Sequence, residues 1–165
     1  MEKTKLFFGE NSYEYARELN NTAYYYNILG IDTEAFSLQE KSLKIRKNLF
    51  GKNSREYSTA LGNIAGNYRD LGDIEQAKKM YEEQLEINKI IYGLNHTSTA
   101  LTQFYLSIIY IDVDLDKSLD FCLEALYIFE NKLGKNSHYY TLALGSLADN
   151  HYKRNDIDSA IIIEE

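Results

Sequence analysis

Three aspartates in this sequence have the alternate spacing of carboxylates that bind calcium. Asp112, Asp114 and Asp116 are separated by single residues, as are the first, third and fifth ligands of a helix–loop–helix calcium site. Such a loop also needs glycine at its sixth position and glutamate at its twelfth, where this sequence has Lys117 and Leu123. We therefore expect no calcium here and interpret the acidic run as a solvated turn between two helices.

The other side chains that could bind a metal or attack a substrate are three histidines and one cysteine. His96, His138 and His151 lack the short spacings at which zinc ligands occur. Cys122 lies between two apolar residues, which is typical of a small buried side chain, and nothing in the sequence marks a base that would activate its thiol. The sequence contains no G-x-x-x-x-G-K phosphate loop. The prediction is a protein that is not an enzyme and uses no metal or cofactor.

Charge and hydropathy argue against two classes of partner. The 165 residues include 18 Lys and Arg against 25 Asp and Glu, for a net charge of −7, which disfavours nonspecific attraction to nucleic acid or anionic lipid. The basic run Lys44-Ile-Arg46-Lys47 is interpreted as a solvated helix face. No stretch approaches the ~18 apolar residues of a membrane helix. A single cysteine fits a reducing compartment, so we predict a cytoplasmic protein with no nucleic-acid or membrane partner.

A turn motif divides the chain into repeats. It reads FGENS, FGKNS, YGLNH and LGKNS, with glycines at 9, 51, 93 and 134, so its successive copies are 42, 42 and 41 residues apart. Small residues recur between the turns at Ala23, Ala65, Ser107 and Ala148, and three positions later come Tyr26, Tyr68, Tyr110 and His151. Such self-similarity indicates one repeat array over 1–165. Its expected parts are 1–10 as the end of a preceding repeat, then 11–52, 53–94 and 95–135, and 136–165 as an incomplete repeat.

The apolar pattern inside each repeat has the period of a helix. In the second repeat one stripe contains Leu61, Ile64, Ala65, Tyr68 and Leu71, and a second stripe follows through Ala77, Met80, Tyr81, Leu85, Ile87 and Ile91. Two antiparallel helices per repeat are therefore predicted. One pair cannot bury both stripes, so neighbouring pairs must stack into an all-α solenoid.

The two ends of the sequence fall inside repeats. Lys5-Leu-Phe-Phe-Gly9 aligns with the end of a second helix, and Ser159-Ala-Ile-Ile-Ile-Glu-Glu165 barely begins one. Terminal repeats of a solenoid usually have a polar outer face, whereas Ile161–Ile163 would form an apolar edge. We therefore expect either a segment of a longer array or self-association through this C-terminal edge.

The segment L-x-N-I-A-x-x-Y-x-x-L-G-D-x-x-x-A at residues 61–77 resembles the tetratricopeptide repeat. The period of 42 residues, the long second helix and the FGKNS turn resemble the kinesin light chain subclass of that family. The family usually has a proline after the histidine of this turn, whereas Thr97 follows His96 here. The resemblance implies a right-handed superhelix of helix pairs, with a concave groove that first helices line and that binds a peptide or a partner helix.

The resemblance also implies which residues face that groove. Those selected are Arg17, Asn20, Asn21, Tyr24, Asn63, Arg69, Phe104, Tyr105 and Asp149. Asn21 and Asn63 correspond to positions where family members hold a peptide backbone through a carboxamide, which both donates and accepts hydrogen bonds. Alternatively, these two side chains only bond neighbouring helices. Tyr24, Phe104 and Tyr105 would form an aromatic shelf, and the arginines and Asp149 would select charge.

These expectations combine into a module for protein–protein interaction, an adaptor or scaffold. The family clamp for a C-terminal carboxylate needs Lys or Arg on the first helix of the third repeat, where Leu101 and Tyr105 stand, so chaperone tails are not expected ligands. The alternative function is a regulatory or sensing arm of a larger enzyme, such as a caspase-like peptidase or a nucleotide-binding protein. A spacer whose groove binds nothing is a third possibility.

Overall fold

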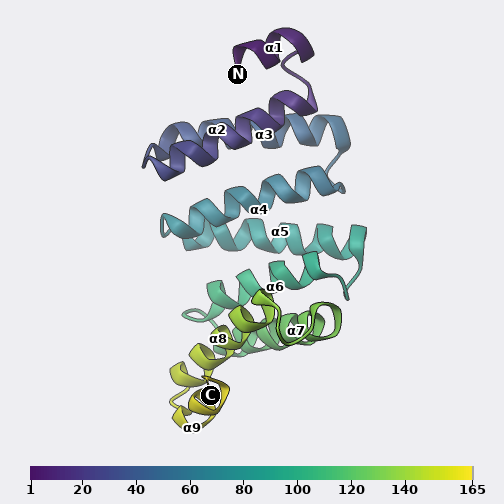
Figure 1. Cartoon of the computed structure of the whole chain (residues 1–165). Coiled ribbons are helices and arrows are strands. Elements are labelled where there is room, and N and C mark those ends of the chain that lie inside the picture. The colour runs from purple at the N-terminus through teal and green to yellow at the C-terminus, as the bar shows by residue number, and fades with distance from the viewer. Residues whose placement is uncertain (165) are drawn as a thin grey trace.

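The computed structural model describes residues 1–164, except for the side chains of Ile161 and Glu164. This part of the chain folds into helices joined by short turns, and the helices stack in sequence order so that the two ends of the chain lie at opposite ends of the array (Figure 1). The helices are α1 (Glu2–Phe8), α2 (Tyr13–Ile28), α3 (Asp32–Phe50), α4 (Arg55–Asp70), α5 (Ile74–Tyr92), α6 (Thr97–Tyr110), α7 (Leu115–Leu133), α8 (His138–Lys153) and α9 (Ile157–Glu164).

The helices are organised as stacked antiparallel pairs. The most extensive contacts lie within the pairs α2–α3, α4–α5, α6–α7 and α8–α9, and each second helix also packs on the first helix of the next pair. This is the predicted all-α solenoid, and the prediction is confirmed. None of the helices in the described chain is both long and apolar enough to cross a lipid bilayer.

The repeated turn has the same backbone conformation in all four copies. Its glycines have φ of 84°, 80°, 84° and 83°, values that favour glycine because other residues meet a steric penalty there. The third residue after the glycine then caps the next first helix: Ser12, Ser54 and Ser137 accept a hydrogen bond from the backbone N–H three residues ahead, and His96 accepts one from Ser98. The motif therefore encodes both a helix stop and a helix start.

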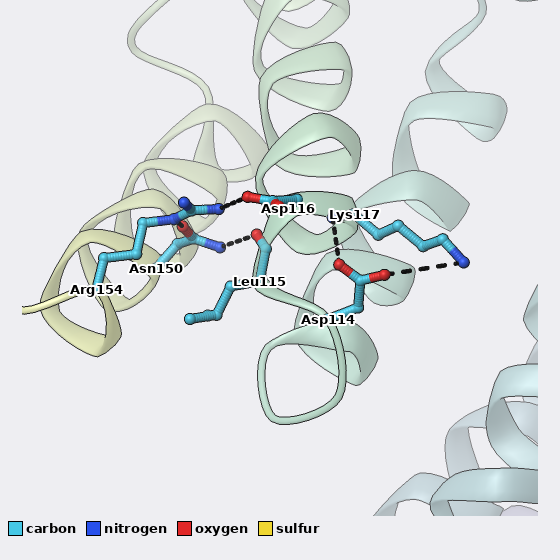
Figure 2. Close-up of polar contacts among 6 residues, drawn as sticks. All are labelled: Asp114, Leu115, Asp116, Lys117, Asn150 and Arg154. Carbon is cyan, nitrogen blue, oxygen red and sulfur yellow. Dashed lines mark hydrogen bonds and ion pairs between the residues drawn. The ribbon is translucent and has the colours of Figure 1, made fainter.

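The turn inside each pair differs in the third repeat. Gly30 and Gly72 have φ of 70° and 81° in the first two repeats, and Asn155 has φ of 62° in the fourth. The third repeat lacks this residue, but it keeps the aspartate cap of the second helix. Asp114 accepts a hydrogen bond from the Lys117 N–H at 3.1 Å (Figure 2), as Asp73 and Asp156 accept from Gln76 and Ser159. The acidic run is thus a connecting turn, as predicted.

Small residues allow the helices of adjacent layers to approach closely. Ala65 and Ala77 are fully buried in a cluster that α4, α5 and α6 share, and the Tyr81 ring fills the space beside them. Cys122 occupies the corresponding interior of the next layer, where its thiol contacts the Ala143 carbonyl. Burial raises the pKa of Cys122 to about 11, so the thiol stays protonated near neutral pH. The prediction of a buried structural cysteine is confirmed.

The basic run on α3 is only partly solvated, and the prediction was wrong for its central residue. Lys44 and Lys47 are exposed, but Arg46 is 6% exposed. Its guanidinium donates to the Glu56 carbonyl at 3.2 Å and lies 5.8 Å from the centre of the Tyr13 ring. A long side chain can bury its stem along apolar surface, and here the charged head is buried as well, so charge alone did not identify the solvated face.

The C-terminal helix α9 leaves apolar surface exposed. Ile162 is 73% exposed and Ile163 is half-buried, whereas the side chain of Ile161 lies outside the described residues. Self-association through this edge stays a prediction.

Candidate functional site

Two adjoining clefts lie between the first helices of successive pairs. The larger, of about 570 Å³, lies between α4 and α6 above α5, and we call it the aromatic cleft. The smaller, of about 270 Å³, lies between α2 and α4 above α3, and we call it the amide cleft. Tyr24, Asn63 and Asn67 line both. The two clefts therefore form one continuous surface across the first three repeats.

Two glycines open the aromatic cleft down to its second-helix floor. Gly62 and Gly66 are one turn apart on α4, on the face that looks toward α5. A Cβ at Gly62 would lie 2.4 Å from the Gln84 Nε2, and a Cβ at Gly66 would lie 3.5 Å from the Tyr81 hydroxyl. Because no side chain of α4 covers these positions, Gln84 and Tyr81 line the cleft directly.

The aromatic cleft combines a stacked ring pair with a cation. The rings of Tyr81 and Tyr105 are 5.2 Å apart and inclined by 22°, and the Arg69 guanidinium lies 5.3 Å from the centre of the Tyr105 ring. Arg69 also pairs with Asp70 at 2.7 Å. Tyr81 is 1% exposed, and its hydroxyl makes no hydrogen bond within residues 1–164. Burial raises the pKa of Tyr81, so this free group is a neutral phenol.

Carboxamides dominate the amide cleft. Asn63 on α4 donates to the Asn20 Oδ1 on α2 at 3.1 Å, and Asn67 on α4 donates to the Gln39 Oε1 on α3 at 2.7 Å. Asn63 therefore does bond a neighbouring helix, as one of the two interpretations of this residue expected. The Oδ1 atoms of Asn63 and Asn67 accept no hydrogen bond within the described chain, so both amides keep an acceptor for a ligand.

The structure brings six of the nine predicted site residues to these clefts. The aromatic cleft contains Tyr24, Asn63, Arg69 and Tyr105, and the amide cleft contains Asn20, Asn21, Tyr24 and Asn63. Arg17 on α2 and Asp149 on α8 are exposed and line neither cleft.

Phe104 does not form part of an accessible shelf, contrary to expectation. It is 6% exposed and packs in the core with Ala125 and Phe129 of α7. In the repeat register Phe104 corresponds to Gly62, and Ala125 corresponds to Gln84. In the third repeat the larger side chain of the facing pair is Phe104, on the first helix. In the second repeat it is Gln84, on the second helix. The space between the two helices has room for only one large side chain.

The residues that sequence reasoning missed come from the second helices. Gln39 of α3 lines the amide cleft, and Tyr81, Gln84 and Asn88 of α5 line the aromatic cleft. Expectations built on first helices alone could not include them. The paired glycines of α4 were the available signal, since two residues without side chains on one helix face expose whatever lies beneath.

The fold is shared with solved structures of repeat proteins. BtubC (BKLC) from P. vanneervenii is 21% identical, with a TM-score of 0.81 over 91% of this chain and 60% of that one. A protein from Podosopora anserina, named as a kinesin light chain with nearly identical TPR-like repeats, is 15% identical, with a TM-score of 0.79 over 98% of this chain and 77% of that one. The apo form of RapI is 21% identical, with a TM-score of 0.82 over 98% of this chain and 43% of that one. At these identities the likeness concerns the fold, and the chain spans less than two thirds of BtubC and of RapI.

Sequence comparison identifies the family. A comparison with curated proteins gives no match. The family model described as tetratricopeptide repeat matches residues 15–89 and 56–113, which together cover more than half of the chain and include both clefts' α4 wall. The structural likeness to kinesin light chain repeats agrees with this match. The chain belongs to the tetratricopeptide repeat family.

Proposed function

We propose that the chain binds an extended segment of a partner protein along the joined aromatic and amide clefts, and so acts as an adaptor or scaffold. The observation that carries this proposal is the continuity of the two clefts through Tyr24, Asn63 and Asn67. A segment lying across them would cross three repeats. The tetratricopeptide fold supports a role in protein–protein interaction in general.

The free polar groups of the clefts suit a peptide ligand. Every residue of an extended peptide presents one N–H and one C=O, and the Asn63 and Asn67 amides offer acceptor oxygens without favouring a particular side chain. Tyr24 is exposed and lies at the junction of the clefts, where its ring would cover ligand side chains. Arg69, held against Tyr105, would favour a ligand with an acidic or aromatic group at that point.

No catalytic role is proposed for this chain. The thiol of Cys122 is buried and stays protonated near neutral pH, because its pKa is about 11. Asp112 and Asp116 pair with Lys153 at 2.6 Å and with Arg154 at 2.7 Å. These groups stabilise the junction of the third and fourth repeats.

The lone cysteine also supports a reducing, cytoplasmic location as part of the proposal.

A peptide-display selection on the full chain tests the proposed function. We expect enrichment of a peptide family whose binding weakens about tenfold or more in Asn63→Ala and in Arg69→Ala, because each substitution removes a hydrogen-bonding or cationic contact from the clefts. Matched controls are Asn131→Ala and Arg55→Ala, which change exposed residues outside both clefts. Equal loss in the controls, or no enrichment on the native chain, would contradict the proposal.

Gly66→Ala should change thermal stability and peptide affinity in opposite directions. Alanine favours a helix over glycine by about 0.5–1 kcal/mol, and the new Cβ would meet the Tyr81 hydroxyl at 3.5 Å, an ordinary contact distance. We expect a higher melting temperature together with weaker binding of the selected peptide, because the methyl group covers the Tyr81 hydroxyl.

The control for this prediction is Gly145→Ala on α8. A Cβ at Gly145 would contact nothing within 4 Å, and Gly145 lines neither cleft. It should gain stability with no change in peptide affinity. If Gly66→Ala binds the peptide as well as Gly145→Ala does, the absence of a side chain at Gly66 has no role in ligand access.

A further inference from the structure

The amide cleft has a chemically uniform lining. Six of its seven residues carry a carboxamide: Asn20, Asn21, Asn27, Gln39, Asn63 and Asn67. The seventh is Tyr24, so none of its lining side chains carries a formal charge at neutral pH. Its volume of about 270 Å³ is below the range of roughly 300–1,000 Å³ typical of sites for drug-sized molecules. The cleft thus offers one neutral hydrogen-bonding compartment with room for a side chain.

The hydrogen bonds already made in the cleft determine which groups remain free. Asn63 and Asn67 donate across the cleft from α4, to Asn20 on α2 and to Gln39 on α3. Each pair uses a donor from the α4 side and an acceptor from the opposite side. In these two pairs, the atoms left over are the amide nitrogens of Asn20 and Gln39 and the carboxamide oxygens of Asn63 and Asn67.

Gln39 is the most constrained of these free groups. It is 4% exposed, its Oε1 accepts the Asn67 hydrogen bond at 2.7 Å, and its Nε2 makes no hydrogen bond within the described residues. The Gln39 Nε2 is not one of the fully buried side-chain atoms that lack a partner, so it keeps contact with the cleft, where a ligand or water can supply an acceptor. The Gln39 Nε2 and the Asn67 Oδ1 belong to one hydrogen-bonded amide pair, so this pair keeps one free donor and one free acceptor.

We infer that the amide cleft binds the carboxamide side chain of an asparagine or glutamine in the partner segment. This inference rests on the proposed function. A primary carboxamide presents its oxygen and an N–H at the same end of the group, so it can accept from Gln39 and donate to Asn67 at once. A trans main-chain amide directs its N–H and C=O in opposite directions and can satisfy only one of the two groups. Charged side chains are disfavoured because the lining supplies no counter-charge.

Parallel selections on the native chain and on Gln39→Glu test the inference. A randomised peptide library should yield native binders that share an asparagine or glutamine at one position. A synthetic binder should lose about tenfold in affinity when that residue becomes Glu, Lys or Leu, because a paired donor and acceptor are lost. Gln39→Glu keeps the acceptor for Asn67 but replaces the free donor by an anion, so its binders should carry Lys or Arg at that position.

Gln76→Glu is the matched control. Gln76 is exposed on α5 and lines neither cleft, so this variant adds the same charge and should enrich the native peptides. Thermal melting followed by circular dichroism verifies that both variants are folded. Native binders without a shared carboxamide position, or Gln39→Glu binders that still prefer it, would overturn the inference while leaving groove binding intact. No enrichment on the native chain would overturn both proposals.

Discussion

Asn88→Ala should lower the free energy of unfolding by about 2–4 kcal/mol, because one buried side chain links three helices. Asn88 on α5 accepts from the Ser58 hydroxyl of α4 at 2.6 Å. It donates to the Thr102 hydroxyl at 3.0 Å and to the Ser98 carbonyl at 3.2 Å, both on α6. Alanine removes all three bonds and leaves the buried Ser58 hydroxyl without this acceptor, while the helical preference of alanine offsets only about 0.6 kcal/mol.

The control for Asn88 is Asn131→Ala. Asn131 is an exposed asparagine of α7 whose side chain, within the described residues, bonds only to the Tyr127 carbonyl of its own helix, at 2.7 Å. Asn131→Ala gains the same helix propensity as Asn88→Ala, and it should change the free energy of unfolding by no more than about 0.5 kcal/mol. Urea unfolding curves of both variants measure the difference. A difference below about 1 kcal/mol between them would show that the three-helix link does not hold the second and third repeats together.

The repeat register shows why such a link escapes sequence reasoning. Asn88 corresponds to Arg46 one repeat earlier and to Phe129 one repeat later. Arg46 reaches the carbonyl of Glu56, the residue that matches Ser98, whereas Phe129 stacks on Tyr139 at 5.5 Å. Periodicity places all three residues at one interface. It does not predict that this interface is held by hydrogen bonds in two repeats and by an aromatic contact in the third.

The fold was predictable because its determinants are local. The turn glycines, the serine caps that follow them and the stripe around Ala65 each act within one helix or one turn, and neighbouring copies of the pattern then dictate stacking. Individual site residues depended on what the facing helix contributes. Phe104 was assigned to the groove from its place on a first helix, but the facing Ala125 leaves space for its ring in the core.

The clefts were predictable only in part for the same reason. Tyr24, Asn63 and Arg69 lie on first helices, so their positions in the repeat were enough to predict them. Gln39 and Tyr81 lie on second helices. They line the clefts because the residues that face them on the first helices are too small or too far away to cover them. Access of that kind is a property of pairs of helices and is not visible in one helix alone.

Asn150→Ala should lower the free energy of unfolding by about 2–3 kcal/mol and release the C-terminal pair of helices first. Asn150 on α8 is fully buried and donates to the Leu115 carbonyl at the start of α7 at 3.0 Å (Figure 2). The Arg154 Nε donates to the Asn150 Oδ1 at 2.8 Å, and the same guanidinium donates to the Asp116 carboxylate at 2.7 Å. These contacts hold the fourth repeat against the shortened turn of the third.

The exposed ion pair in this network should matter much less than the buried amide. Asp116→Ala removes the outer contact with Arg154, between a largely exposed carboxylate and a partly exposed guanidinium, and should cost no more than about 1 kcal/mol. Hydrogen exchange measures both effects by region. In Asn150→Ala, α8 and α9 should lose protection while α4 and α5 keep theirs, because neighbouring repeats of a solenoid are coupled only through their shared interface. Uniform loss of protection along the chain, or equal effects of the two substitutions, would mean that Asn150 is not what couples the last repeat to the array.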